Sequence, residues 1–203
     1  DPYVGYGGGV CAEISADIMF MDCNFVENQA DSGGGIYLSN ADAMVIDCNM
    51  VANRSLRGGG LFGISSSINI ISSEIRNNQA TTDANDPNEN SVLATGAGIY
   101  CLSGGLNIQD CNVSGNIADF SGGGAYLRSV NNVSIFNCLI LNNAAGRDGG
   151  GISSNWFTST NISNCTFVGN SAIGNVGQAN RTGYGGALYC SYESESTVFD
   201  SIF

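Results

Sequence analysis

The sequence predicts an all-β fold, a right-handed parallel β-helix of about seven coils with three short strands in each coil. Two observations predict it. A Gly-rich motif and a motif that ends in Asn alternate along the 203-residue chain, with a period of about 25–27 residues where uninterrupted. Apolar residues also recur at three fixed positions of each period, in short alternating runs rich in β-branched side chains. Such runs are typical of strands.

The two motifs recur in register over the whole chain. The Gly-rich motif occupies residues 7–10, 33–36, 58–61, 96–99, 122–125, 149–152 and 185–188. The Asn-ending motif occupies residues 25–28, 50–53, 75–78, 113–116, 140–143 and 167–170. Glycine permits sharp corners and close packing of coils. Gly-rich loops that cradle phosphate need a helix after them, and no helix is predicted here, so we exclude nucleotide binding.

Each strand of a coil contributes one apolar column to the predicted core. The first column is Val10, Ile36, Leu61, Ile99, Ala125, Ile152 and Leu188. The second is Phe20, Val45, Ile70, Ile108, Ile135, Ile162 and Val198, and the third is Phe25, Met50, Ile75, Val113, Ile140, Phe167 and Phe203. We therefore expect residues 1–203 to form a single domain, with polar loop insertions at about 81–95 and 173–184.

The asparagine that ends each second motif is predicted to be structural. Asn tolerates left-handed turns, and its amide can bond to the same group of the next coil. A ladder is therefore expected, formed by Asn28, Asn53, Asn78, Asn116, Asn143 and Asn170.

Tandem GG[AIL]-type and FxxN-type motifs, such as Gly185-Gly186-Ala187-Leu188 and Phe25-Val26-Glu27-Asn28, resemble the repeats of the chlamydial polymorphic outer-membrane proteins. They also resemble repeats of other secreted β-helix proteins. The resemblance covers essentially the whole chain and implies a surface-exposed, passenger-type β-helix used in adhesion or display. It carries no catalytic residue over, and the autotransporter barrel of that family is not present in this chain.

Five cysteines share one repeat position, which points inward: Cys23, Cys48, Cys111, Cys138 and Cys165. A stack of small buried side chains is one interpretation. Disulfides between adjacent coils are the other, because a coil spacing of about 4.8 Å lies within the Cα separation that a disulfide allows. Cys23 with Cys48, and Cys138 with either neighbour, are the candidate pairs.

An outward aromatic stripe is predicted next to the first column, formed by Tyr37, Phe62, Tyr100, Tyr126 and Tyr189. Stacking between coils would stiffen the sheet. The same stripe could instead be a contact surface for sugar or another chain.

Asn-x-Ser/Thr sequons occur at six positions, of which Asn53 belongs to the ladder and is expected to be buried. We expect Asn112 to point outward, and Asn132, Asn161 and Asn164 to lie at strand corners. The sequons expected to carry sugar in a eukaryotic source are Asn112, Asn132, Asn161, Asn164 and Asn180.

The charge of the chain excludes two classes of partner. The formal net charge is −12, all six basic residues are Arg, and no apolar run is long enough to span a bilayer. Such a chain repels nucleic acids and anionic membranes.

Asp22, Asp47, Asp110 and Asp200 recur at one corner, and Asp22 with Asp47 is a weak candidate cation site. A repeating acidic edge is the plainer interpretation, so we expect no enzyme and no cofactor.

A β-helix leaves unpaired strands at its ends unless they are capped. The spacing from Phe203 to the Val10 of a following copy would be 10 residues, against 11 from Phe25 to Ile36. The sequence therefore favours an extracellular structural protein that stacks head to tail into a filament. The alternative is an adhesin module of a larger surface protein that binds carbohydrate or a cell-surface ligand, and a polysaccharide-active enzyme is less favoured.

Overall fold

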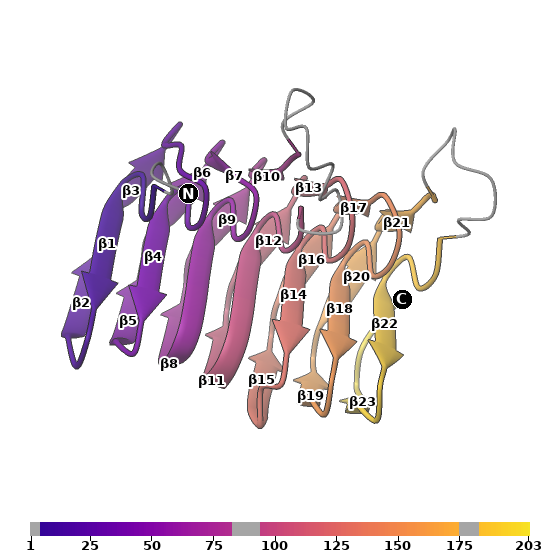
Figure 1. Cartoon of the computed structure of the whole chain (residues 1–203). Coiled ribbons are helices and arrows are strands. Elements are labelled where there is room, and N and C mark those ends of the chain that lie inside the picture. The colour runs from indigo at the N-terminus through magenta and orange to yellow at the C-terminus, as the bar shows by residue number, and fades with distance from the viewer. Residues whose placement is uncertain (1–4, 83–93, 175–182) are drawn as a thin grey trace.

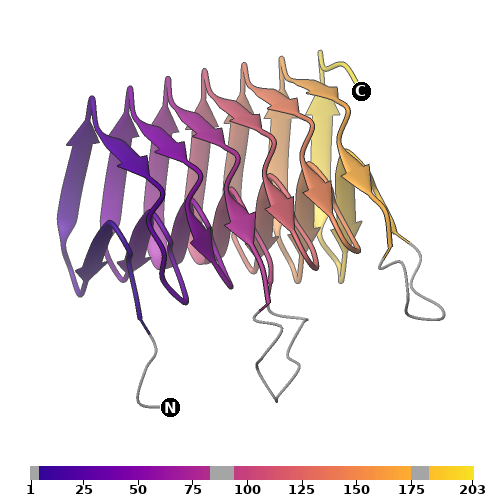
Figure 2. The ribbon, with the colours of Figure 1, turned by 90° about the horizontal axis from the view of Figure 1, so that it is seen from above.

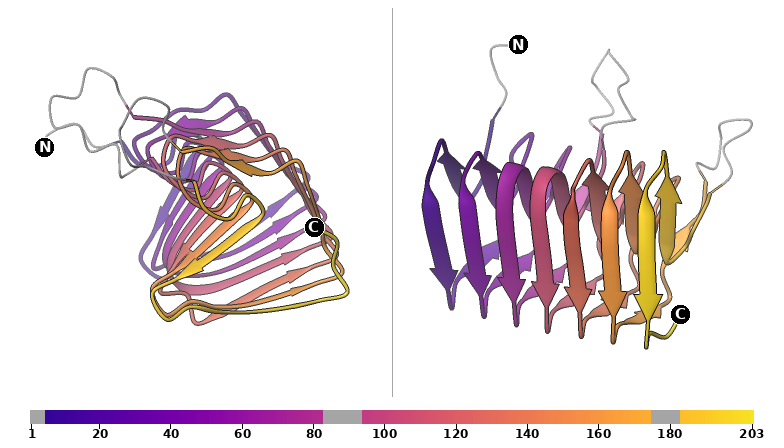
Figure 3. Two further views of the ribbon diagram at one scale, coloured as in Figure 1. Left: turned by 90° about the vertical axis from the view of Figure 1, so that its right-hand side faces the viewer. Right: turned by 90° about the horizontal axis from the view of Figure 1, so that it is seen from below.

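The computed structural model describes residues 5–82, 94–174 and 183–203. These residues form parallel strands and turns, wound as stacked coils around one axis (Figure 1). Successive coils lie side by side along the rod (Figure 2), and the view along the axis shows them one behind another (Figure 3). The predicted parallel β-helix is confirmed.

The largest sheet contains 12 strands in two rows. The first row is β1 (Val10–Glu13), β4 (Ile36–Ser39), β8 (Leu61–Ile71), β11 (Ile99–Gln109), β14 (Ala125–Arg128), β18 (Ile152–Asn155) and β22 (Leu188–Ser191). The second row contains β2 (Asp17–Met21), β5 (Asp42–Ile46), β15 (Asn132–Phe136), β19 (Ser159–Ser163) and β23 (Glu195–Phe199). Because β8 and β11 run through the corner between the rows, they join both rows into one sheet.

Two smaller sheets complete the coils. One contains β3 (Asn24–Val26), β6 (Asn49–Val51), β9 (Glu74–Arg76), β12 (Asn112–Ser114), β16 (Leu139–Leu141) and β20 (Thr166–Val168). The other contains the two-residue strands β7 (Arg54–Ser55), β10 (Gln79–Ala80), β13 (Ile117–Ala118), β17 (Ala144–Ala145) and β21 (Ser171–Ala172). These short strands add a fourth strand to most coils, which the three-strand prediction omitted because two residues are too few to show alternation.

The three apolar columns are in the predicted register. Val10 pairs with Ile36, Phe20 with Val45, and Phe25 with Met50, and the same pairing continues coil by coil. Ile36, Val45 and Met50 are fully buried, as are most of their equivalents in the next four coils. Stacking of like side chains thus produces one continuous core along the axis. The predicted loop insertions lie largely outside the described residues.

The third glycine of each Gly-rich motif allows close contact between coils. A Cβ atom on Gly60 would lie 2.6 Å from the carbonyl oxygen of Gly98 in the next coil. Equivalent clashes would occur at Gly9, Gly35, Gly98, Gly124 and Gly151, each with the carbonyl of the residue that follows it in the column. The motif therefore sets how tightly the coils pack at this corner.

Candidate functional site

The six ladder asparagines form one hydrogen-bonded column inside the rod. In the four inner coils the side chains are fully buried: Asn53, Asn78, Asn116 and Asn143. The Asn78 Nδ2 donates to Oδ1 of Asn116 at 3.0 Å, and the Asn78 backbone N–H donates to the same oxygen. Asn78 Nδ2 also donates to the carbonyl of Met50 in the preceding coil. Because these groups are bonded to one another, the column is a structural element rather than a site for a ligand.

Of the two interpretations of the cysteine column, the structure has the stack of free thiols and no disulfide at the candidate pairs. All eight cysteines lie within the described residues, and all are free thiols. The thiols of Cys48, Cys111, Cys138 and Cys165 are buried, and each donates to the carbonyl oxygen two residues earlier in the chain. These local bonds satisfy the buried thiols without a covalent link. The cysteine column is therefore the stack of small buried side chains that was the alternative to disulfides.

The acidic corner has a conformational explanation in place of a metal site. Asp22, Asp47 and Asp110 have φ values of 53°, 51° and 55°. Asp, Asn and Ser occupy this turn because they tolerate the left-handed conformation. Asp22 and Asp47 are exposed, and no group of three or more metal-ligating side chains occurs among the described residues. The candidate cation site at Asp22 and Asp47 is therefore not supported.

The sequons fall into different surroundings. Asn53 is fully buried in the ladder, as predicted from its position. Asn132, Asn161 and Asn164 are exposed, although Asn161 lies within β19 and not at a corner. Asn112 faces away from the core, between the buried Cys111 and Val113, but it is only half-exposed and its Oδ1 is buried without a hydrogen-bond partner. Asn180 lies outside the described residues.

The outer face of the second strand row carries a shallow groove that follows the rod axis. It consists of two adjoining hollows of about 370 and 380 Å³, which share Ser67 and Asn69. We call this surface the axial groove; its polar lining is Asp17, Asp42, Ser67, Asn69, Asn107, Asn132, Ser134 and Asn161. Amide, hydroxyl and carboxylate groups of this kind suit a ligand that is rich in hydrogen-bonding groups.

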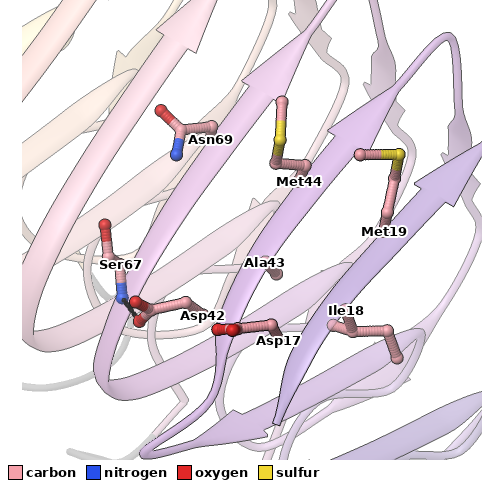
Figure 4. A pocket seen from close by; sticks show the side chains of 8 residues that line it. All are labelled: Asp17, Ile18, Met19, Asp42, Ala43, Met44, Ser67 and Asn69. Carbon is pink, nitrogen blue, oxygen red and sulfur yellow. Dashed lines mark hydrogen bonds between the residues drawn. The ribbon is translucent and has the colours of Figure 1, made fainter.

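The first hollow of the axial groove contains two acidic side chains that the sequence argument missed (Figure 4). Asp17 and Asp42 are paired in register on β2 and β5, and Asp42 Oδ1 accepts a hydrogen bond from the Ser67 backbone N–H at 2.7 Å. Met19 and Met44 lie beyond them on the same strands (Figure 4). Asp17 and Asp42 lie five residues before Asp22 and Asp47, so their recurrence was visible in the sequence. Only the strand register showed that the two carboxylates share a hollow.

The aromatic stripe is continuous over four coils and then stops. Ring centroids are 5.2 Å apart for Tyr37 and Phe62, 4.9 Å for Phe62 and Tyr100, and 5.3 Å for Tyr100 and Tyr126. The predicted stacking between coils is present, and together with the packed side chains of Ile64 and Leu102 it buries Tyr37, Phe62 and Tyr100. The prediction overlooked Ser153, which separates Tyr126 from Tyr189 in the register.

A family model described as a right-handed beta helix region matches residues 5–201. The chain belongs to the right-handed β-helix family. Neither a curated protein nor a solved structure matches the chain. Membership in the right-handed β-helix family establishes the architecture and its hand. The narrower likeness to the polymorphic outer-membrane repeat is not shown.

The last described coil of this β-helix exposes side chains from its core columns. Phe203 stacks on Phe167 at 4.7 Å and is still 61% exposed, and Val198 is 37% exposed. Within the described residues, β22 pairs only with β18, and β23 pairs only with β19. The described part of the chain contains no helical segment with the length and hydropathy needed to span a bilayer.

Proposed function

We propose that this chain is an extracellular adhesive module, a stiff β-helix rod that binds a surface ligand along its side. The axial groove is the observation that carries this proposal, because it is hollowed, combines polar with apolar side chains and continues over several coils. A groove of this length fits a polymer lying along the rod better than a single small molecule. The motif resemblance to surface-displayed passenger β-helices agrees with this role.

We further propose that the module is not an enzyme and that it works outside the cell. The acidic turn residues recur at one structural corner of successive coils, whereas enzyme sites usually depart from a repeat. The sequon at Asn164 lies on an exposed side chain outside the axial groove, so an oligosaccharide there would leave the groove open. The buried thiols are shielded from oxidants, which makes them compatible with an oxidising compartment.

An array of neutral and acidic surface polysaccharides tests the adhesive role. The fluorescently labelled chain should be retained by at least one polysaccharide. Asn107→Arg with Ser134→Arg fills the axial groove with two bulky side chains and should reduce retention by a neutral polysaccharide at least ten-fold. Ser114→Arg on β12, on another face of the rod, is the matched control and should bind normally. Retention by no polysaccharide, or equal loss in the control, would contradict the proposal.

Head-to-tail stacking with a second copy is the second candidate function, and the exposed apolar side chains of the last coil favour it. The sequence favoured head-to-tail stacking over the adhesive role, but the Ala187 side chain opposes stacking. Ala187 occupies the position of the third glycine, where a Cβ in the six preceding coils would clash with the carbonyl of the following coil. A copy added after Ala187 would therefore have to shift. It would also place Asp22 after Asp200 and Asp17 after Glu195, which adds repulsion between like charges.

Sedimentation velocity over a range of protein concentrations tests this stacking. If it occurs, Ala187→Gly should strengthen association, Phe203→Asp should weaken it, and added salt should strengthen it by screening the facing carboxylates. A wild-type chain and an Ala187→Gly chain that both remain monomeric at high concentration and moderate salt would exclude head-to-tail stacking.

A further inference from the structure

The aromatic stripe lacks a ring at one coil, where the fully buried Ser153 lies beneath the side chain of Asn155. Tyr126, Ser153 and Tyr189 occupy one column on three successive coils. Parallel strands lie about 4.8 Å apart, so the two tyrosines are separated by roughly 10 Å. Stacked aromatic rings have centroids about 4.5–7 Å apart, so a ring placed between them would contact both. In the preceding coils a tyrosine or phenylalanine supplies that ring, and here the small Ser153 does not.

A cavity of about 230 Å³ lies at this break, on the outer face of β14, β18 and β22. Its floor is fixed by hydrogen bonds: Asn155 Nδ2 donates to Ser153 Oγ at 2.8 Å, and Ser191 Oγ donates to Asn155 Oδ1 at 2.6 Å. We call it the Ser153 slot; its lining is Phe120, Ser121, Tyr126, Arg147, Asp148, Asn155, Trp156, Tyr189 and Tyr192. Pockets for drug-sized ligands start at about 300 Å³, so this volume suits a single ring.

Asp148 supplies a polar group that the protein leaves unsatisfied. The residue is 5% exposed and lines the Ser153 slot, and its Oδ2 lies 3.1 Å from Arg147 Nε. Its Oδ1 is buried and has no hydrogen-bond partner among the described residues, although the Ser121 hydroxyl lies close enough to influence the carboxyl. A buried acceptor without a donor costs about 1–3 kcal/mol. A bound molecule with a hydroxyl or N–H group would remove that cost.

The charges and free ring faces around the slot select among ligands. A cation would meet two arginines, because Arg147 lies 5.0 Å from the Phe120 ring and Arg128 lies 5.1 Å from the Trp156 ring. Trp156 also stacks on Tyr192 at 4.4 Å, so its faces are not free to form a cage around an ammonium group. The Tyr126 hydroxyl is a potential donor, because it is protonated at neutral pH and burial raises its pKa further, to about 12. These features favour a neutral ring that carries hydroxyl groups.

We propose that the Ser153 slot binds one neutral hexopyranose unit, held between the rings of Tyr126 and Tyr189 with a sugar hydroxyl donating to Asp148 Oδ1. The aliphatic faces of the sugar ring cover the tyrosine faces, and its edge meets the carboxylate. The site lies on a different row of strands from the axial groove, and the proposal does not depend on that groove.

The single tryptophan of the chain, Trp156, lines the slot and reports its occupancy. The methyl glycosides of glucose, galactose, mannose and N-acetylglucosamine are titrated separately, with Trp156 fluorescence and saturation-transfer NMR as readouts. At least one glycoside should give a saturable signal in both measurements, with a dissociation constant in the millimolar range. Choline is titrated as the cationic comparison and should give none.

Three variants locate the binding. Ser153→Tyr restores the ring found at this position in the preceding coils and should abolish the signal, while Asp148→Asn keeps the shape and should weaken binding at least ten-fold. Tyr189→Ala, in the last described coil, removes one wall of the slot and should also abolish the binding signal. This second variant keeps the test valid if Ser153→Tyr fails to fold. Tyr6→Ala is the matched control, because Tyr6 stacks at the far end of the stripe, 4.6 Å from Tyr37, and it should bind as the wild type does.

The proposal is overturned if no glycoside gives a saturable signal, if a folded Ser153→Tyr variant binds as the wild type does, or if choline binds and the glycosides do not.

Discussion

The side-chain Nδ2 of Asn116 donates a hydrogen bond to Oδ1 of Asn143, 2.9 Å away in the next coil. The same nitrogen donates to the carbonyl of Ile75, and the Asn116 Oδ1 accepts two bonds from Asn78. One fully buried side chain thus connects three coils.

Asn116→Ala should therefore destabilise the rod strongly. The substitution removes the acceptor of the Asn78 backbone N–H and of one Asn78 Nδ2 hydrogen, and it removes the donor to the Ile75 carbonyl. The Asn143 Oδ1 keeps only its bond from the backbone N–H of residue 116. Since each unsatisfied buried group costs about 1–3 kcal/mol, we expect a loss of about 3–6 kcal/mol. Urea unfolding followed by circular dichroism measures it. Asn107→Ala, on the outer face of β11, is the control and should change stability by less than about 0.5 kcal/mol. Equal effects of the two substitutions would contradict the structural role of the ladder.

Gly60→Ala tests the close packing of the glycine corner. Its Cβ would lie 2.6 Å from the Gly98 carbonyl oxygen, so one coil must move, and overpacking of this kind costs about 1–3 kcal/mol. Gly105→Ala is the matched control, because its Cβ would find no atom nearer than 3.8 Å and its φ is not left-handed. That variant should be neutral or slightly stabilising, by about 0.4–1 kcal/mol at most. The melting temperature of Gly60→Ala should therefore be lower than that of Gly105→Ala.

Thiol alkylation should distinguish two classes of cysteine. Cys11 and Cys190 are exposed and should react in the native protein, whereas Cys101 is fully buried and burial raises its pKa to about 12. The thiolate is the reactive form, so buried thiols should react only after unfolding. Mass spectrometry after iodoacetamide treatment counts the labels. Eight labels on the unfolded, unreduced chain are expected, and fewer would reveal disulfides.

The stability of the rod should depend on the ionisation of Asp148. Burial raises the pKa of this carboxyl above its ordinary value of 3.8, and the Arg147 charge opposes that shift. The folded state therefore holds the proton more tightly than the unfolded state. The proton on Asp148 therefore adds to the free energy of unfolding. This added stability is fully present below pH 3.8 and is lost as the pH rises through the folded-state pKa. Asp148→Asn should gain stability relative to the wild type as the pH rises from acid to neutral. A difference in melting temperature that does not change with pH would contradict this assignment.

Sequence periodicity predicted most of the fold because each coil repeats the same physical task. The columns that contain Val45, Met50 and Asn78 could be placed from spacing alone, since a one-residue error would turn apolar side chains outward. The thiol column was ambiguous, because the spacing between coils permits both a disulfide and a free thiol. The burial of Phe62 could not be predicted, because it depends on neighbouring side chains such as Ile64 and on the contact between stacked rings.

The functional surfaces were harder to predict because they depend on how neighbouring coils combine. Asp17 and Asp42 are 25 residues apart in sequence and become neighbours only through the β2–β5 register. Ser153 was visible as a small residue in an aromatic column, but its importance depends on Asp148, which approaches from a different corner of the coil.

The asparagine ladder gives the rod a polarity of its own. From Asn28 to Asn143, every side-chain amide donates toward the following coil and accepts from the preceding one where a partner exists. Each Oδ1 also accepts from the backbone N–H of the preceding asparagine, and Nδ2 of Asn53, Asn78, Asn116, Asn143 and Asn170 also donates to a backbone carbonyl, so the amides can reverse neither singly nor together. The column is therefore a chain of amide dipoles that point one way, in which each bond polarises the next. This alignment makes the two directions along the rod axis electrically different.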